Sequence, residues 1–360
     1  MVFTIDPVYP KGNATITVIG IGGGGGNAIN RMIEAGIKGV EFIVANTDAQ
    51  ALQDSLAGIR LQVGEDHTRG LGAGGNPSIG EKAAEEDADT VKDVLKGSDM
   101  VFITAGFGGG TGTGGAPVIA KIAKENGALT VGVITKPFMF EGKKRHQRAM
   151  EGIEKLRKNV DTLLVIPNQK LFSVISADTT ALETFKVADD VLRQAVQSIS
   201  DIITTKGVIN VDFADVKSVM HNAGDAIMGL GYGDGDDRAV VAAKSAITSP
   251  LLEDVSIEGA EGLLVNVTGN KGMTMFEIEA AMKLIHSSVS PEADVFFGHT
   301  IDDELQNAIK ITVIATGCKK KNNTGRQSAV PGPRVQHTES VSESSTMKMP
   351  AYLRRKDQVK

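Results

Sequence analysis

Two glycine-rich loops, each lying between a predicted buried strand and a predicted helix, constrain this chain more than any other feature. The longer one, GFGGGTGTGGAP at 106–117, follows the apolar run DMVFITA and precedes APVIAKIAKEN, whose apolar residues have helical spacing. The other, IGGGGG at 21–26, follows the apolar run ATITVIG. This order of strand, glycine loop and helix places backbone N–H groups and a helix N-terminus where they can hold a phosphate.

The same alternation continues along the chain. Apolar runs predict strands at 14–20, 40–46, 99–105, 128–135 and 161–167, and helices are expected at about 27–37, 78–95 and 115–126, with an extended loop at 64–77. A helical stretch at 178–203 precedes further strands and two helices, at about 237–247 and 274–286. We therefore expect an α/β fold: a mostly parallel, doubly wound nucleotide-binding domain joined by a long central helix to a smaller α+β domain.

Composition excludes several other classes of protein. The 360 residues are 41% hydrophobic, enough for a sizeable core, but no apolar run approaches the roughly 18 residues of a membrane span. A single cysteine, Cys318, excludes an intrachain disulfide and a multi-cysteine metal site, and the six histidines show no metal-ligand spacing. We expect a cytoplasmic protein with no direct membrane insertion and no metal held by protein side chains alone.

Charge separates the C-terminal tail from the rest. Residues 319–360 hold ten Lys and Arg against three Asp and Glu, a net charge of +7, which leaves −13 for the remainder of a chain whose total is −6. Residues 319–346 have too few apolar side chains to fold alone, and apolar residues return among basic ones in MKMPAYLRRKDQVK at 347–360. This pattern indicates a disordered linker and a partner-binding peptide, and the absence of a basic surface elsewhere argues against nucleic acid as the main partner.

Two readings of the glycine loops are open at this point. Residues 20–25 satisfy G-x-G-x-x-G, and Asp48 closes the next strand, which would suit a nicotinamide- or flavin-dependent oxidoreductase. However, a dinucleotide needs only one such loop, and this chain has a second at 108–114 and a third, GAGGN, at 72–76. No G-x-x-x-x-G-K-[ST] sequence supplies a phosphate-binding lysine. Backbone N–H groups, helix dipoles, threonine hydroxyls and a metal ion would then hold a nucleoside triphosphate.

The three loops contain no group that could orient an attacking water, but NVDFAD at 210–215 could supply one. Asn210, Asp212 and Asp215 lie at the start of a predicted helix. Asp212 as N-cap with Asp215 three residues later resembles an acidic capping box, which needs no catalytic role. Both readings, capping and catalysis, follow from the same residues.

Several rare motifs in order make the chain resemble the tubulin/FtsZ superfamily, and within it the FtsZ family of bacterial cell-division GTPases. They are VIGIGGGGGNAINRM, VANTDAQAL, GLGAGGNP, GFGGGTGTGGAPVIA, TKPFMFEGKKR, IPNQKL, NVDFADVKSVM, TSPLLEDVSIEGAEGLLVN and the terminal MPAYLRR. The resemblance covers about residues 12–318 and the last dozen. It implies GTP and GDP as bound nucleotides, Mg²⁺ accompanying them, GTP hydrolysis, and head-to-tail filaments that form the division ring.

The resemblance also implies roles for residues that match the family's motifs. The loop at 23–27 would lie near the α- and β-phosphates, and the loop at 72–76 would sense the γ-phosphate. Gly110, Thr111 and Gly112 would hold the phosphate chain. Glu141 would contact the ribose, Arg145 the nucleotide edge and Phe185 the guanine face. Asp189 replaces the family's asparagine, and its carboxylate can accept both guanine N1–H and N2–H. The full predicted nucleotide set is Gly23, Gly24, Gly25, Gly26, Asn27, Asp48, Gly72, Ala73, Gly74, Gly75, Asn76, Gly108, Gly109, Gly110, Thr111, Gly112, Thr113, Gly114, Glu141, Arg145, Phe185 and Asp189.

Catalysis and partners follow from the same resemblance. Asn210, Asp212 and Asp215 would enter the nucleotide site of the next subunit, so that hydrolysis requires assembly; a non-hydrolysing homologue is the alternative. Residues 347–360 would bind membrane-tethering division proteins of the FtsA and ZipA kind, at midcell beneath the inner membrane. The expected segments are an arm at 1–12, a GTP-binding domain at 13–177, a central helix at 178–203, a GTPase-activating domain at 204–318, a linker at 319–346 and the peptide at 347–360.

Overall fold

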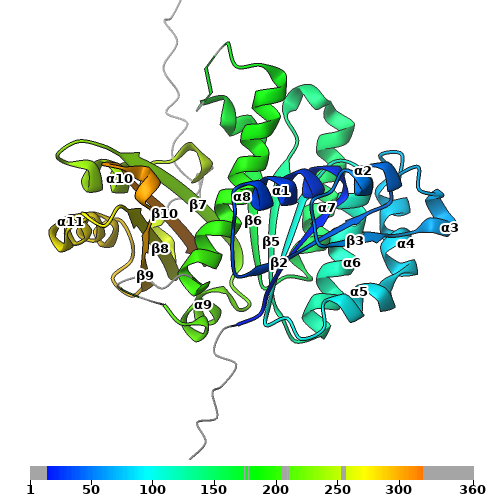
Figure 1. The fold of residues 1–360 in the computed structure, drawn as a ribbon, viewed down its shortest axis with the longest axis horizontal. Helices are drawn as coiled ribbons and strands as arrows, with labels where there is room; N and C mark the ends of the chain where they lie inside the picture. Colours follow the sequence, from blue (N-terminus) through cyan, green and yellow to red (C-terminus); the bar gives the residue numbers. More distant parts are fainter. Residues whose placement is uncertain are drawn as a thin grey trace, which may run out of the picture. The chain divides into compact units, whose positions relative to one another are not determined.

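The computed structural model describes residues 14–173, 175–176, 178–204, 209, 211–252 and 257–318. Within these ranges, ten strands form one sheet in the order β3-β2-β1-β4-β5-β6-β7-β10-β8-β9 (Figure 1). The strands are β1 (Ile16–Ile21), β2 (Val40–Asn46), β3 (Ile59–Gln62), β4 (Met100–Gly106), β5 (Leu129–Lys136), β6 (Thr162–Pro167), β7 (Gly224–Gly233), β8 (Gly262–Gly269), β9 (Asp294–Ile301) and β10 (Ile309–Thr316). The helices are α1 (Gly22–Glu34), α2 (Ala49–Gln53), α3 (Glu65–Thr68), α4 (Pro77–Glu86), α5 (Ala88–Val94), α6 (Thr111–Glu125), α7 (Lys143–Arg157), α8 (Ala181–Thr204), α9 (Phe213–Met220), α10 (Arg238–Ile247) and α11 (Met275–His286).

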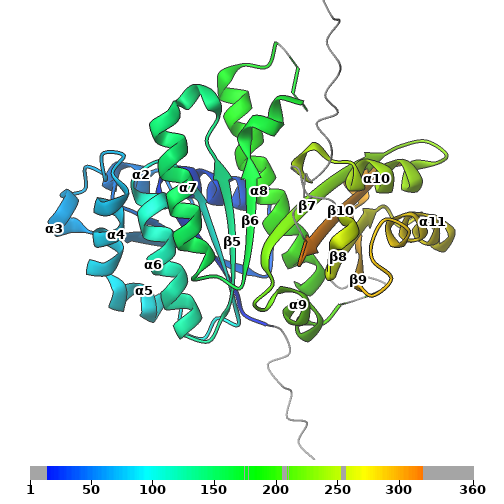
Figure 2. The same cartoon turned by 180° about the vertical axis from the view of Figure 1, so that it is seen from behind.

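The first six strands are parallel and are covered on both faces, as their nearly continuous apolar runs predict. Helices α1, α2, α8 and α9 bury side chains on one face (Figure 1), and α4 to α7 on the other (Figure 2). From β1 the chain moves to β2 in one direction along the sheet, whereas from β4 it moves to β5 in the opposite direction. Because crossovers between parallel strands are right-handed, the two directions place their helices on opposite faces.

Both glycine loops are shorter than predicted, because the helices begin inside them. Helix α1 starts at Gly22 instead of Asn27, and α6 starts at Thr111 instead of residue 115. Glycine is a poor helix former, so residue propensity places both starts too late. Packing against the sheet outweighs that propensity, and the glycine runs become the first turns of two helices.

Residues 59–95 also differ from the prediction. The expected loop at 64–77 contains the short helix α3, the sequence pattern did not indicate β3, and the single helix expected at 78–95 is divided into α4 and α5. The division falls at Asp87, whose backbone has φ −103° and ψ 22°. Its carboxylate accepts a hydrogen bond of 2.7 Å from the backbone N–H of Gly64, a tertiary contact that explains the break.

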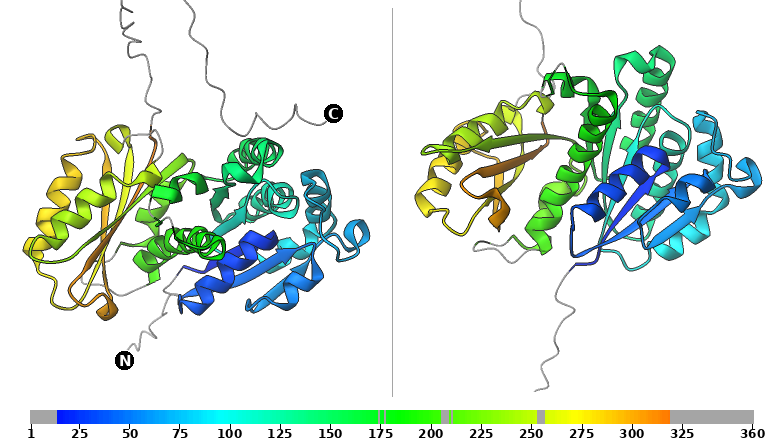
Figure 3. Two further views of the ribbon diagram at one scale, coloured as in Figure 1. Left: turned by 90° about the horizontal axis from the view of Figure 1, so that it is seen from above. Right: turned by 45° about the horizontal axis from the view of Figure 1, so that its top comes forward.

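The long predicted connector is α8, which lies between the N-terminal strands and the C-terminal strands (Figure 3). Beyond it the sheet continues: Thr162–Leu164 of β6 pair with Gly224–Ala226 of β7, and β7 then pairs antiparallel with β10. Helices α10 and α11 match the two predicted helices within about a residue and cover a separate apolar core with β8 and β10. The predicted fold class is confirmed, whereas the exact domain boundaries stay a prediction.

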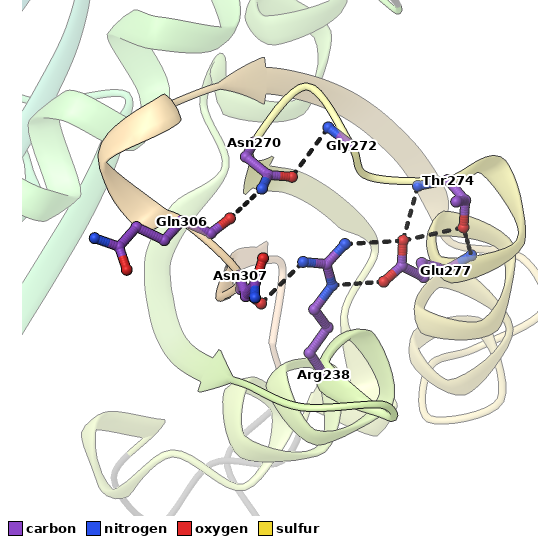
Figure 4. A network of polar contacts seen from close by, with 7 residues as sticks. All are labelled: Arg238, Asn270, Gly272, Thr274, Glu277, Gln306 and Asn307. Carbon is purple, nitrogen blue, oxygen red and sulfur yellow. Dashed lines mark hydrogen bonds and ion pairs between the residues drawn. The ribbon is translucent and has the colours of Figure 1, made fainter.

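A polar network fixes the loops at the ends of the C-terminal elements (Figure 4). Arg238, at the start of α10, donates two hydrogen bonds to Glu277 of α11 and a third, of 2.9 Å, to the carbonyl of Asn307. Thr274 and Glu277 form the capping box that starts α11. This network ties α10, α11 and the turn before β10 together.

Several predicted segments lie outside the described residues: the arm at 1–12, the linker at 319–346, the peptide at 347–360 and Asn210. In the part of the chain that the structure covers, no helix is both long and apolar enough to cross a membrane.

Candidate active site

The two glycine-rich helix starts meet at one point of the sheet. Strands β1 and β4 are adjacent and parallel, with Gly20 opposite Thr104, and the chain leaves them in opposite directions along the sheet. In open α/β sheets, ligands bind outside the carboxyl ends of the strands at such a switch point. Helix α1 follows β1 directly, and α6 follows β4 after a short loop. Two helix N-termini with bare backbone therefore face the same place.

Backbone contacts hold these two helix starts together. A methyl group built on Gly24 would lie 3.1 Å from the backbone nitrogen of Gly106, and one built on Gly22 would lie 3.0 Å from that of Gly112. No side chain fits between such backbones without displacing them. The hydroxyl of Thr113 accepts a hydrogen bond of 2.8 Å from Gly108 N–H, which closes the loop at 108–113.

The third predicted loop joins the other two. A methyl group built on Gly110 would lie 2.7 Å from Cβ of Ala73 and 3.0 Å from the backbone nitrogen of Asn76. Asn76 is the N-cap of α4, and its side chain accepts a hydrogen bond of 3.1 Å from Ser78 N–H. The N-termini of α1, α4 and α6 thus converge, and together they form a strong anion-binding arrangement.

The predicted glycines have two different structural roles. A methyl group on Gly25 would lie 2.5 Å from the carbonyl oxygen of Thr104, and one on Gly114 would lie 1.9 Å from that of Pro77, so these two glycines are required by packing. In contrast, methyl groups on Gly23 and Gly109 would meet no atom within 4 Å. Packing does not explain these two glycines, whereas a ligand that approaches the backbone closely would.

Asp48 lies beside the third loop and caps a helix. Its carboxylate oxygen Oδ1 accepts hydrogen bonds from Gln50 N–H (3.0 Å) and Ala51 N–H (3.2 Å) at the start of α2. An isolated bridge pairs Asp48 with Leu71, immediately before Gly72. The structure therefore gives Asp48 a capping role and brings it next to the loop at 72–76.

Glu141 and Arg145 form an ion pair beside the glycine loop at 108–113. Arg145 Nε lies 3.1 Å from Glu141 Oε2, and Glu141 Oε1 accepts a hydrogen bond of 2.8 Å from Phe138 N–H. The aliphatic part of Arg145 covers Gly108, since a methyl group there would lie 2.7 Å from Arg145 Cγ. The ion pair thus joins the turn before α7 to Arg145, whose aliphatic part packs on the glycine loop.

Phe185 belongs to an aromatic cluster that no motif of the sequence predicted. Its ring centroid lies 5.5 Å from that of Phe138 and 6.4 Å from that of Phe140, in edge-to-face geometry. Phe172 contacts Phe138 from another side, with centroids 5.4 Å apart. Phe185 remains 42% exposed despite these ring contacts. The repeated phenylalanines in PFMF were the available sequence signal.

Asp189 lies one helical turn after Phe185 on the same face of α8. Burial raises the pKa of its carboxyl group to about 7, and the positive charge of Arg31 on α1 opposes this shift. Because desolvation disfavours the charged form, this carboxyl group changes protonation near neutral pH.

Asp212 and Asp215 lie at the other end of the sheet. Helix α9 leads into β7, whose first residue, Gly224, pairs with Thr162 at the amino end of β6. The Thr162 hydroxyl donates a hydrogen bond of 2.5 Å to the carbonyl of Met220, the last residue of α9. The glycine loops follow the carboxyl ends of the parallel strands, whereas α9 lies at the amino ends. The length of the strands therefore separates the glycine loops from α9 (Figure 1).

The length of helix α8 gives the distance between the two ends of the sheet. The helix starts near the aromatic cluster, and at its other end Thr204 packs against Gly39, just before the amino end of β2, where a methyl group would lie 2.9 Å from Thr204 Cβ. Its 24 residues span about 36 Å at 1.5 Å per residue. The two predicted aspartates therefore do not reach the glycine loops of their own chain. Among the described residues, no group of three or more His, Cys, Asp or Glu side chains could hold a metal ion.

Comparison with known proteins identifies the class of protein that has this site. Residues 15–176 match the model of the Tubulin/FtsZ family GTPase domain, and residues 224–319 match the FtsZ family C-terminal domain. The fold is thus that of a tubulin-like GTPase.

Solved structures narrow this assignment. An FtsZ dimer from M. jannaschii is 46% identical, covers 88% of this chain and 95% of its own, and superposes with a TM-score of 0.83. A mutant FtsZ from M. jannaschii is also 46% identical, with 86% and 96% covered and a TM-score of 0.82. CetZ2 from Haloferax volcanii, described as a GTPγS-bound protofilament, has 20% identity, coverage of 85% and 94%, and a TM-score of 0.72, which shows the shared fold alone. The chain belongs to the FtsZ family, and it is a GTPase that binds guanine nucleotides.

Proposed function

We propose that this protein is a GTP-hydrolysing filament protein of bacterial cell division, whose active site is completed by the next subunit. The N-termini of α1, α4 and α6 would bind the triphosphate, with the loop at 72–76 on the γ-phosphate. Glu141 and Arg145 would contact the ribose and the nucleotide edge. Phe185 would stack on guanine, and Asp189 would accept its N1–H and N2–H.

One observation carries this proposal: the glycine-rich loops and the two aspartates lie at opposite ends of the sheet. A chain with half of an active site at each end can complete it only by contact with another copy. Such a contact joins two different surfaces, and because it does not close on itself it generates filaments. The dimer described for FtsZ of M. jannaschii supports this arrangement.

The chemistry at the contact follows from the residue types. Phosphoryl transfer to water needs positioning, stabilisation of charge and an oriented water molecule. Three helix N-termini supply positioning and positive potential. Asp212 and Asp215 of the neighbouring copy would orient the water, together with Asn210. Mg²⁺ would enter with the triphosphate, since it prefers phosphate oxygens and water as ligands, and would offset part of the negative charge.

The cellular role extends this proposal. Loss of the γ-phosphate would weaken the contact, so GTP favours assembly and hydrolysis favours release. Residues 347–360 would bind membrane-tethering division proteins of the FtsA and ZipA kind at midcell in the cytoplasm. The segment boundaries predicted from the sequence, with the central helix between a GTP-binding and a GTPase-activating domain, belong to the same proposal. The match to the FtsZ C-terminal family model supports it.

Turnover per molecule against protein concentration tests the proposal. We expect GTP turnover near zero at high dilution, a rise above a threshold, and no comparable turnover of ATP. Asp212→Asn should abolish turnover while GTP still binds. A mixture of Asp212→Asn with a variant impaired in nucleotide binding, Arg145→Ala, should recover part of the activity, because each supplies the half that the other lacks. Turnover that is constant on dilution, or unchanged in Asp212→Asn, contradicts a shared site.

A further inference from the structure

Thr47 lies between two of the glycine-rich loops, and it belongs to the VANTDAQAL motif, in which only Asp48 was assigned a role. It follows β2 directly, at the carboxyl edge of the sheet, and its side chain is fully buried. A buried hydroxyl group needs a hydrogen-bond partner. The Thr47 hydroxyl group bonds to one of the glycine-rich loops, and the Thr47 backbone carbonyl bonds to another.

The hydroxyl group of Thr47 bonds to the longer glycine loop. Its Oγ1 lies 2.6 Å from Oγ1 of Thr111, the first residue of α6. Only one of the two hydroxyl hydrogens can lie between these oxygens. If Thr47 donates, the hydrogen of Thr111 is free to point to a phosphate oxygen; if Thr111 donates, its hydrogen points away from the ligand. The fully buried Thr47 hydroxyl must give its hydrogen to an acceptor, and Thr111 Oγ1 supplies one, so Thr47 donates and leaves the hydrogen of Thr111 free.

The backbone of Thr47 bonds to the other loop. Its carbonyl oxygen accepts a hydrogen bond of 3.1 Å from Gly72 N–H, at the start of the loop at 72–76. The Thr68 hydroxyl also donates to this carbonyl, over 3.3 Å. One buried residue therefore connects the loop that would contact the γ-phosphate with the loop that would hold the phosphate chain.

We propose that Thr47 is a positioning residue, which orients the Thr111 hydroxyl toward the nucleotide phosphates and links the two phosphate loops. This inference rests on the proposed assignment of these loops to the phosphates. Its effect should be confined to the phosphate end of the ligand. The affinity for guanosine, which lacks phosphates, should not depend on Thr47.

Isosteric variants of Thr47 separate this role from packing. Thr47→Val removes the hydroxyl group but keeps the branched shape and the carbonyl, whereas Thr47→Ser keeps the hydroxyl group. We expect Thr47→Val to weaken GDP binding about five- to tenfold, the range of one hydrogen bond, and Thr47→Ser to stay within about twofold of wild type. In a double-mutant cycle, Thr47→Val should add nothing to Thr111→Val.

Thr17→Val is the matched control. Thr17 is also buried, and its hydroxyl group also bonds to a hydroxyl group, that of Ser98 at 2.8 Å, but at the amino end of the same sheet. This variant should change the melting temperature about as much as Thr47→Val and leave GDP binding unchanged. Dissociation constants for GDP and guanosine, measured by titration calorimetry below the assembly threshold, decide the outcome.

Results of three kinds overturn the inference. In the first, Thr47→Val binds GDP like wild type. In the second, Thr47→Ser is as impaired as Thr47→Val, or Thr47→Val fails to fold while Thr17→Val folds, so that the role is packing. In the third, Thr47→Val weakens guanosine as much as GDP. Failure of the loop assignment itself is distinguishable, because wild type would then bind guanosine as tightly as GDP.

Discussion

Asp212 and Asp215 cap each other: Asp215 N–H donates to Asp212 Oδ1 over 2.9 Å, and Asp212 N–H donates to Asp215 Oδ2 over 3.3 Å. The capping box read from the sequence is therefore present. It does not exclude catalysis, because each carboxylate uses one oxygen in the box. The same pair can start α9 and face a neighbouring subunit.

Two substitutions of Asp212 should separate capping from catalysis. Asparagine is as good an N-cap as aspartate, whereas alanine is a poor one. Asp212→Ala should lower the free energy of unfolding by about 0.5–2 kcal/mol, and Asp212→Asn should leave it nearly unchanged. Both should lose GTP turnover, because both remove the charge. Urea unfolding alongside turnover checks this, and an active Asp212→Asn protein would reduce the residue to a cap.

Gly23→Ala and Gly114→Ala should behave in opposite ways. A methyl group at Gly23 meets open space in the first turn of α1, so Gly23→Ala should fold with a free energy of unfolding equal to wild type or up to about 1 kcal/mol higher. Its affinity for GDP should still fall about tenfold, because the methyl group blocks the approach of a phosphate to the backbone. Gly114→Ala should instead lower stability by about 1–3 kcal/mol, since α4 and α6 must separate. Melting temperature and GDP titration distinguish the two cases.

The affinity for guanosine should rise with pH around neutrality. Burial raises the pKa of Asp189 to about 7, and only the ionised carboxylate accepts both guanine donors. Between pH 6 and pH 8 the ionised fraction increases about tenfold, and the affinity should follow it. Without ligand, the free energy of unfolding should change with pH in the opposite direction. Because the pKa of Asp189 is raised in the folded state, its carboxyl group stabilises the fold at low pH, and this contribution is lost as pH rises through 7. Asp189→Asn should bind guanosine without pH dependence, and a parallel slope in this variant would assign the titration to another group.

Acid should break the ion pair between Arg238 and Glu277, which we call the clamp (Figure 4). The hydrogen bonds from Arg238 lower the pKa of Glu277 from 4.5 to about 2, against the opposing effect of burial. A lowered pKa contributes stability above about pH 4.5, and the contribution is lost as pH falls toward 2. Glu277→Gln should therefore lower the free energy of unfolding by about 1–2 kcal/mol at pH 7 and by almost nothing near pH 2.

Asp303→Asn is the control for this clamp. Asp303 pairs with Lys271 at 2.7 Å in the neighbouring turns, but both side chains are exposed, at 59% and 75%. Exposed pairs contribute little, so Asp303→Asn should not change the urea midpoint measurably at pH 7. If Glu277→Gln and Asp303→Asn lowered the urea midpoint equally, the pair of Arg238 and Glu277 would stabilise the fold no more than an exposed ion pair does.

The glycine loops and the aspartates show how far sequence patterns reach. Strand, glycine loop and helix follow one another within about 25 residues, so their order predicts a phosphate site without knowledge of the rest of the fold. The boundaries of α1 and α6 could not be read in this way, because glycine propensity opposes the helices that tertiary packing imposes. Asp87 is a similar case, since its contact with Gly64 across 23 positions breaks a helix that the local pattern continues.

The amino-acid sequence by itself determined the class of fold, the three phosphate-type loops and the capping box at Asp212, because each depends on residues close together in the chain. Only the tertiary structure decided which glycines are required by packing and which line open space, and that Phe138, Phe140, Phe172 and Phe185 form one cluster. It also decided that Thr47 joins two loops and that the aspartates lie at the far end of the sheet. These relations depend on strand order and direction, which bring distant segments together and which local patterns do not encode.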